Sequence, residues 1–157
     1  MKQTKKISES RSTMVKVLSP VDANHYGYVH GGVIMKYVDE AAYVSATRHA
    51  HKNVVTASLD HMTFEAPAHI GDILVLKSSI NNVWNTSMEV GVRVEVETKE
   101  GRQYLIGRAY ATMVALDAMG KPTKVPGLTL ETKEDKRRAK EALMRRKARL
   151  KGSSNPL

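Results

Sequence analysis

The sequence contains no cysteine among its 157 residues. This absence excludes disulfide bonds, thiolate metal ligands and cysteine nucleophiles. Aromatic side chains make up only 5% of the chain, so platforms on which nucleic-acid bases could stack are scarce. No apolar run approaches the ~20 residues that a membrane-spanning helix needs. The basic N-terminus has no apolar stretch behind it and does not resemble a secretory signal. We therefore expect a cytoplasmic protein without a stable membrane anchor.

Several catalytic motifs are missing as well. The chain has no HExxH zinc motif, no GxSxG nucleophile elbow and no GxxxxGK[ST] phosphate loop. The pair His49 and His51 has no carboxylate at ligand spacing. We therefore expect no metal site and no required cofactor.

The charge of the chain is concentrated at its two ends. The formal net charge is +9, of which residues 1–16 carry +4, residues 131–151 carry +6, and the body between them carries −1. A nucleic-acid reader usually places its basic residues in the folded body, so we expect no nucleic-acid partner. Two interpretations of the basic ends stay open: a solvated surface, or attraction of an anionic ligand such as a phosphate-bearing molecule.

The hydrophobic pattern predicts one α+β domain. In residues 31–50, apolar and small side chains recur at i, i+3 and i+4 and leave little polar face, which is typical of a helix at the centre of a core. Strands are predicted before and after this helix, with short connections between them. Because the strands do not alternate with helices, we expect one antiparallel sheet wrapped around the helix. The predicted strands are 13–19, 54–67, 72–81, 87–98 and 104–117.

Two further segments have recognisable faces. The last predicted strand has a face of small or unbranched side chains, which favours close packing of the central helix. Residues 132–151 predict a basic surface helix that begins with a capping pattern at Thr132 and Asp135 and has a thin apolar stripe. The expected organisation is a flexible basic N-terminus at 1–11, one domain at 12–128, and a basic C-terminal helix and tail at 129–157. The small face comprises Gly107, Ala109, Ala111, Met113 and Ala115, and the stripe comprises Ala139, Ala142, Leu143 and Leu150.

The stretch NHYGYVHGGVIMKYVDEAAYVSA, residues 24–46, places the acids Asp39 and Glu40 inside this apolar helix. Burying an unpaired carboxylate costs several kcal/mol. The glycines at the helix start expose backbone N–H groups that can hold an oxyanion, and an acid further along the helix could act on a water or on the carbonyl carbon. The pattern therefore suggests acyl transfer. The alternative is that both acids face solvent or a subunit interface.

A wider set of residues resembles a known family. Asp22, Asn24, Gly27, the pair Gly31–Gly32, Met35 and Asp39 resemble the signature of the hot-dog-fold acyl-coenzyme A (CoA) thioesterases. The similar branch contains bacterial broad-range and animal cytosolic long-chain acyl-CoA hydrolases, and the likeness covers residues 12–127. The fold that it implies, a sheet wrapped around a long helix, agrees with the element order.

The resemblance implies roles for particular residues. Asp39 matches the helix carboxylate that acts as general base or nucleophile, and Asn24 matches a loop asparagine contributed by the opposite subunit. The amides of Gly31 and Gly32 match those that bind the thioester carbonyl. A homodimer is the implied catalytic unit, with a hexamer of three dimers as the larger assembly. His30, beside the glycines, either holds the loop or touches substrate.

Binding of CoA is also implied by the resemblance. Extended pantetheine can pair with an exposed strand backbone, and the segment resembling that strand comprises Val55, Thr56, Ala57, Ser58 and Leu59. Trp84 either stacks on the adenine or packs within the protein. The adjacent loop, with the hydrogen-bonding residues Asn85, Thr86 and Ser87, lacks the basic residue usual in the family. The phosphates are therefore assigned to Arg108, Lys121, Lys124 or the C-terminal arginines.

The function expected from the sequence is hydrolysis of acyl-CoA thioesters to free CoA and a carboxylic acid. Three alternatives stay open: a non-catalytic protein that binds acyl-CoA as a regulator, a nucleic-acid-binding protein that uses the basic ends, and a dehydratase. Neither the acyl chain length nor the choice between base and nucleophile for Asp39 follows from the sequence.

Overall fold

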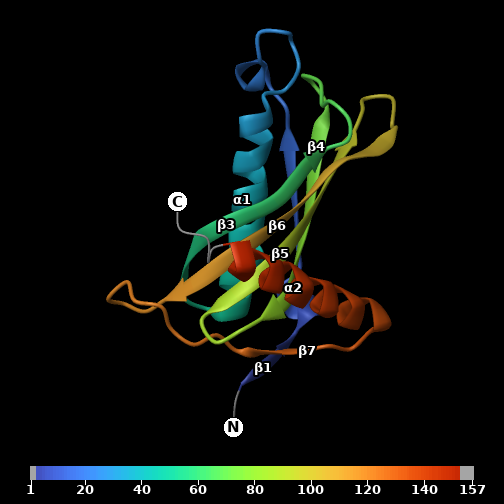
Figure 1. Cartoon of the computed structure of the whole chain (residues 1–157). Coiled ribbons are helices and arrows are strands. Elements are labelled where there is room, and N and C mark those ends of the chain that lie inside the picture. The colour runs from blue at the N-terminus through green and yellow to red at the C-terminus, as the bar shows by residue number, and fades with distance from the viewer. Residues whose placement is uncertain (1–2, 153–157) are drawn as a thin grey trace.

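The computed structural model describes residues 3–152 and contains one five-stranded antiparallel sheet, in the order β2-β4-β5-β6-β3 (Figure 1). A two-stranded parallel sheet pairs β1 with β7. The order of elements confirms the predicted sheet and long helix. The elements are β1 Thr4–Lys6, η1 Ile7–Glu9, β2 Ser12–Val17, η2 Pro20–Asp22, α1 Gly31–Ala50, β3 Asn53–Phe64, β4 Ile73–Val83, β5 Ser87–Glu97, β6 Gln103–Leu116, β7 Gly127–Thr129 and α2 Lys133–Gly152.

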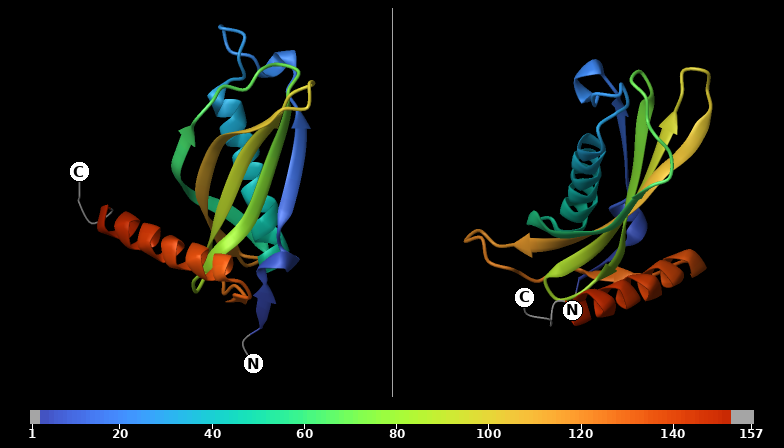
Figure 2. Two further views of the ribbon diagram at one scale, coloured as in Figure 1. Left: turned by 90° about the vertical axis from the view of Figure 1, so that its right-hand side faces the viewer. Right: turned by 45° about the horizontal axis from the view of Figure 1, so that its top comes forward.

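The core lies between α1 and the inner face of the sheet, which curves around the helix (Figure 2). The alternation along β5 sends Met88 and Val90 inward, where both are fully buried, and sends Glu89 to the outer face. Four small or apolar residues of α1 are also fully buried against the sheet, and they give the helix its close approach to the strands. They are Val38, Ala41, Ala42 and Ala46.

The small face of β6 packs as the sequence predicts, except at Gly107. Ala109, Ala111, Met113 and Ala115 are fully buried in the core. A Cβ atom at Gly107 would instead lie 2.4 Å from the carbonyl oxygen of Thr63 on β3. Glycine is therefore required there because the β3 backbone passes too close for a side chain. The register of β3 against β6 shifts twice in this region, so the last part of β3 is bent.

The helix α2 lies on the outer face of the sheet, on the side opposite α1 (Figures 1 and 2). It begins with the predicted cap, in which the Asp135 amide donates to the Thr132 hydroxyl and the Thr132 amide donates to the Asp135 carboxylate, each at 3.0 Å. Arg145 anchors the middle of the helix through an ion pair to Glu89 at 2.7 Å. The sequence predicts that this helix frays at residues 152–157; α2 includes Gly152, and residues 153–157 lie outside the described part.

The N-terminal segment differs from the flexible arm that its composition predicts. Residues 4–9 form β1 and η1, and Ile7 is only 2% exposed. The Lys5 ammonium donates to the carbonyl oxygen of Arg48 at 3.2 Å, near the last turn of α1, where a positive charge is favourable. Burial lowers the pKa of Lys5, and the nearby carboxylate of Glu9 acts in the opposite direction. This segment therefore packs against the domain rather than extending from it, and residues 1–2 lie outside the described part.

Candidate active site

Asp39 lies on the side of α1 that the sheet does not cover, where it is half-buried. The hydroxyl of Thr56 on β3 donates a hydrogen bond of 2.5 Å to Oδ1 of Asp39. The same hydroxyl lies 3.4 Å from the sulfur of Met113. The strand thus fixes one carboxylate oxygen and leaves Oδ2 available to a water or a substrate.

Asn24 is oriented by its own loop. Its side-chain oxygen accepts hydrogen bonds from the backbone N–H groups of Tyr26, at 2.9 Å, and Tyr28, at 3.2 Å. Because both partners are donors, the oxygen faces the loop. The NH2 group therefore points away from the loop as a hydrogen-bond donor. A 2.8 Å bond from the His30 amide to the Asp22 carbonyl ties this loop to the start of α1.

The two glycines at the helix start are not equivalent. The N–H of Gly32 donates to Nδ1 of His30 at 3.1 Å, so the imidazole acts as the N-cap of α1. The N–H of Gly31 has no protein acceptor within residues 3–152. Of the two amides predicted to bind a carbonyl, only the Gly31 amide is free in this conformation.

Asn24 and Gly31 line the same open cavity, of about 440 Å³. Apart from Glu65, which forms an ion pair with Arg108, the rest of its wall is largely apolar. The Phe64 ring comes within 3.5 Å of the position that a Gly31 Cβ would occupy. The cavity therefore combines two hydrogen-bond donors with an apolar surface, as a site for the carbonyl of an acyl group requires. The apolar residues of the wall include Tyr28, Val29, Ile34, Ala66, Pro67 and Ala68.

Asp39 does not line this cavity. It follows Gly31 by eight residues, which corresponds to about 12 Å along the helix axis. An aspartate side chain is far shorter than this separation. A carbonyl held by the Gly31 amide is therefore out of reach of Asp39 in the same chain.

The surface around Asp39 is suited to contact with another chain. The strand β3 is an edge of the sheet, so the backbone groups on its outer side are unpaired. Large apolar side chains are exposed here on both elements: Met35 at 42% and Tyr43 at 46%, each one turn from Asp39 on α1, and Val55 at 45% on β3. A second chain along this edge would cover these side chains.

The residues assigned to CoA binding lie in three places: along the β3 edge, around the two loops that contain Asn85 and Lys124, and at Arg108 on β6. Residues 55–59 form part of the exposed β3 edge. The loop at Asn85 contacts the loop at Lys124, since the Asn85 carbonyl accepts from the Val125 amide at 3.0 Å and the Lys124 carbonyl accepts from Lys52 near the end of α1 at 2.8 Å. The guanidinium of Arg146 lies over the ring of Trp84, with its central carbon 4.4 Å from the ring centroid. Thr86 and Lys121 belong to the same two loops, and Ser87 is the first residue of β5.

Arg108 lies elsewhere. It pairs in register with Thr63, near the far end of β3, and its guanidinium is 3.0 Å from the Glu65 carboxylate. The ten-residue step from Asn53 to Thr63 spans roughly 33 Å of strand. Within one chain, therefore, Arg108 and the Lys121–Lys124 loop cannot contact the same phosphate.

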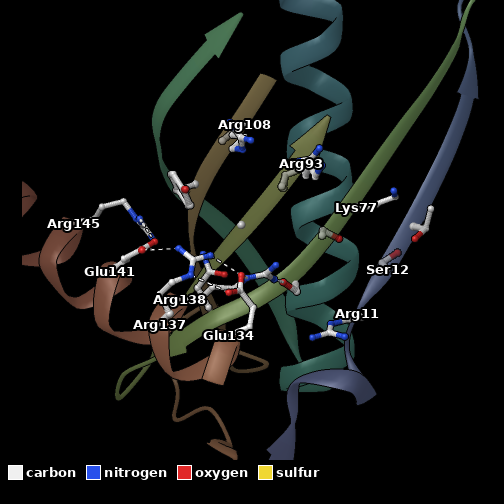
Figure 3. Close-up of a pocket in the computed structure, with 18 residues that line it drawn as sticks. Arg11, Ser12, Lys77, Arg93, Arg108, Glu134, Arg137, Arg138, Glu141 and Arg145 are labelled. Carbon is white, nitrogen blue, oxygen red and sulfur yellow. Dashed lines mark hydrogen bonds and ion pairs between the residues drawn. The ribbon is translucent and has the colours of Figure 1, made fainter. Parts of the chain in front are cut away.

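A larger groove of about 680 Å³ lies on the outer face of the sheet beside α2 (Figure 3). Arginines dominate its lining, but they have carboxylate partners: Arg93 contacts Glu95 and Arg138 contacts Glu134. Among the residues assigned to the phosphates from the sequence, Arg108 and the C-terminal arginines Arg137, Arg138 and Arg145 line it. Within residues 3–152 no group of three acidic or histidine side chains is arranged to hold a metal ion, and no helix is long and apolar enough to cross a membrane.

Comparison with known proteins identifies the family of this chain. Residues 26–102 match the thioesterase superfamily. A solved hexameric acyl-CoA thioesterase superimposes with a TM-score of 0.93 at 37% identity, over 98% of this chain and 99% of that one. The chain belongs to the thioesterase superfamily. The rat cytosolic acyl coenzyme A thioester hydrolase is 34% identical to this chain over 96% of the chain's length. The chain spans only 41% of the length of the rat protein.

A third relative of this thioesterase-superfamily chain can be compared with it at the candidate active site. The acyl-CoA hydrolase of Staphylococcus aureus, solved with butyryl CoA and CoA, is 36% identical, with a TM-score of 0.86 over 96% of this chain and 94% of that one. It has also been solved with an asparagine, an aspartate or a threonine replaced by alanine. Those three residues are 15 and 17 positions apart, the spacing of Asn24, Asp39 and Thr56 here.

Two contacts at the site were not predicted from the sequence. Thr56 was assigned to pantetheine binding through its backbone, and the bond from its hydroxyl to Asp39 has no local sequence signal. The capture of the Gly32 amide by His30 follows the ordinary preference for a side-chain acceptor at a helix start, but histidine is not among the usual N-cap residues.

Proposed function

We propose that this chain is an acyl-CoA thioester hydrolase whose active site is completed by a second copy of the chain. The observation that carries the proposal is the separation of two chemically complementary parts. The donors of Asn24 and Gly31 share one cavity, and the carboxylate of Asp39 stands about 12 Å further along the helix. Two chains packed along the β3 edge would bring the donors of one to the carboxylate of the other.

Each residue then has a defined role. The Gly31 amide and the Asn24 NH2 group donate to the thioester oxygen and stabilise the negative charge that develops on it. Asp39 of the second copy takes a proton from water through its free Oδ2 as the water oxygen attacks the thioester carbon. The carbon–sulfur bond breaks, CoA leaves as the thiolate and takes up a proton, and the carboxylic acid remains. Thr56 holds Asp39 in position.

Asp39 could instead attack the carbonyl carbon itself and form an anhydride, which water then hydrolyses. A single turnover in ¹⁸O-labelled water distinguishes the two routes. Direct attack by water places the label in the released acid, whereas hydrolysis of an anhydride at the Asp39 carbonyl places it in the protein. Label in Asp39 would assign the nucleophilic route.

We assign the pantetheine arm to the β3 edge at Val55–Leu59, whose outward backbone groups can pair with its amides. The direction from Thr56 toward Asn53 leads to Asn85 and the Lys121–Lys124 loop, which supports these residues, rather than Arg108, as contacts of the nucleotide phosphates. The hexameric relative supports a hexameric assembly, in which we propose three such dimers, and the rat relative, named as cytosolic, supports a cytoplasmic location.

The test mixes two inactive variants, Asn24→Ala and Asp39→Ala, after partial unfolding and reassembly. In a mixed dimer one site lacks both groups and the other keeps both. Random reassembly should therefore restore roughly a quarter of wild-type turnover of acyl-CoA. No recovery would show that both groups act within one chain. A wild-type protein that binds acyl-CoA but releases no CoA would replace the enzyme by a regulatory binding protein.

A further inference from the structure

The basic helix α2 separates its arginines from its lysines. All five of its arginines contact other parts of the protein or acids on the helix. These contacts use the ion-pairing and stacking geometry of the guanidinium group, and Figure 3 shows three of the arginines beside Glu134 and Glu141. The partners are Glu134 and Glu141 for Arg137, Glu134 for Arg138, Glu89 for Arg145, Trp84 for Arg146 and Asp60 for Arg149.

The lysines of α2 point the other way. Lys136, Lys140 and Lys147 are exposed, and none has an ion pair within residues 3–152. Their spacing of four and seven residues aligns them in one row along the helix. The row lies on the side away from the buried Ala142. The outer side of α2 therefore carries positive charge that the protein does not neutralise.

Apolar side chains flank this row of lysines. Leu143 is 41% exposed, Met144 is 62% exposed and Leu150 is 56% exposed. The thin apolar stripe identified in the sequence is divided in the structure: Ala139 and Ala142 are buried, whereas Leu143 and Leu150 are exposed. The reason is that the helix contacts the sheet through arginines, which leaves its larger apolar side chains on the outer side.

We propose that this outer face of α2, formed by Lys136, Lys140, Lys147, Leu143 and Met144, binds the surface of an anionic lipid bilayer. Unpaired lysines are attracted to anionic headgroups, and apolar side chains beside them can enter the boundary between headgroups and acyl chains. The helix would lie in the plane of the surface. Binding would be peripheral and reversible, and it does not depend on the proposed hydrolase activity.

Two other occupants fit this face less well. A nucleic acid would use the lysines but gains nothing from an exposed leucine and methionine, and the face has no aromatic side chain for base stacking. A second copy of the same face would oppose lysine to lysine across a two-fold axis, and such like-charge contacts are unfavourable. A lipid surface uses both the charge and the apolar groups.

The experiment is cosedimentation of the full chain with vesicles of phosphatidylcholine, with and without phosphatidylserine. We expect binding only to the anionic vesicles, and weaker binding as salt is added. Each lysine near an anionic surface contributes roughly a fivefold gain in affinity, so Lys140→Gln with Lys147→Gln should weaken binding by roughly 25-fold. The matched control is Lys99→Gln with Arg102→Gln, which removes the same charge from an exposed hairpin and should bind as wild type.

A second variant, Leu143→Ser with Met144→Ser, separates a bilayer from a nucleic acid. The proposal requires it to lose vesicle affinity, because the apolar groups enter the bilayer. The proposal is overturned if anionic vesicles do not bind, or if the control variant loses as much affinity as the lysine variant. Binding to duplex DNA that needs the lysines but not Leu143 or Met144, without vesicle binding, would assign the face to nucleic acid. A smaller assembly in light scattering of either α2 variant would assign it to a subunit contact.

Discussion

The hydroxyl of Thr56 donates to Oδ1 of Asp39, and this bond joins the edge strand β3 to the uncovered side of α1. It fixes the orientation of the carboxylate before any substrate is present. Valine has nearly the shape of threonine and lacks only the hydroxyl, so the bond can be removed with little change in side-chain volume. The bond therefore offers a direct measure of what orientation contributes to turnover.

Replacing Thr56 by valine should lower kcat with little change in KM. A hydrogen bond to a charged group contributes roughly 1.5–3 kcal/mol, which corresponds to a loss of roughly 10- to 100-fold. Thr56→Ser keeps the hydroxyl and should retain most of the activity. Steady-state kinetics of both variants with a short acyl-CoA gives the comparison, and a Thr56→Val enzyme with wild-type kcat would show that Asp39 needs no support from β3.

Replacing Asn24 by aspartate separates its two functions. A carboxylate still accepts from the Tyr26 and Tyr28 amides, so the loop should keep its conformation and the protein its thermal stability. The donor toward the cavity is lost, and removal of one oxyanion donor costs roughly 100- to 1,000-fold in kcat. Full activity in Asn24→Asp would mean that this residue only shapes the loop.

The pair formed by Glu89 and Arg145 should dominate the stability of the contact between α2 and the sheet. The Glu89 side chain is 1% exposed and also accepts from Asn81 at 2.9 Å. Glu89→Ala leaves the guanidinium without its carboxylate, and we expect a loss of roughly 3–5 kcal/mol in the free energy of unfolding.

The control for this change is Glu131→Ala, which removes the partner of Lys6 at the surface and should cost no more than about 1 kcal/mol. Urea unfolding with unchanged m-values gives both numbers. Equal effects of the two substitutions would contradict the structural role assigned to the buried pair.

Acid should destabilise the fold through His49. The residue is fully buried, its Nε2–H donates to the Pro126 carbonyl at 3.1 Å, and its Nδ1 has no partner within residues 3–152. Burial lowers the pKa of His49 below the ordinary value of 6.5, against the opposing effect of the Pro126 carbonyl. The unfolded chain therefore takes up a proton first, so the free energy of unfolding falls as the pH drops below about 6.5 and through the folded-state pKa.

The substitution His49→Gln keeps a donor for the Pro126 carbonyl but does not titrate. Urea unfolding between neutral and mildly acidic pH should show a smaller loss of stability in this variant than in wild type. Parallel curves for the two proteins would assign the acid sensitivity to other groups.

The sequence predicts the fold well because hydrophobic periodicity is local. The bounds of α1 agree with the predicted 31–50, and the alternation along β5 identifies its buried face correctly. The short strands β1 and β7 were not predicted, because a strand of three residues is too short to show an alternating hydrophobic pattern. At the site, the separation of Gly31 from Asp39 follows from their eight-residue spacing on one helix, but the bond from Thr56 to Asp39 joins two elements, and no local pattern encodes it.

The separation of Gly31 from Asp39 has a genetic consequence. In the shared site proposed above, a chain lacking Asp39 would still lend its Asn24 and Gly31 to an intact partner, so each hybrid dimer would keep one working centre. Loss of one function in one allele would therefore be partly masked, and two alleles damaged at different parts of the site would complement each other within the same oligomer.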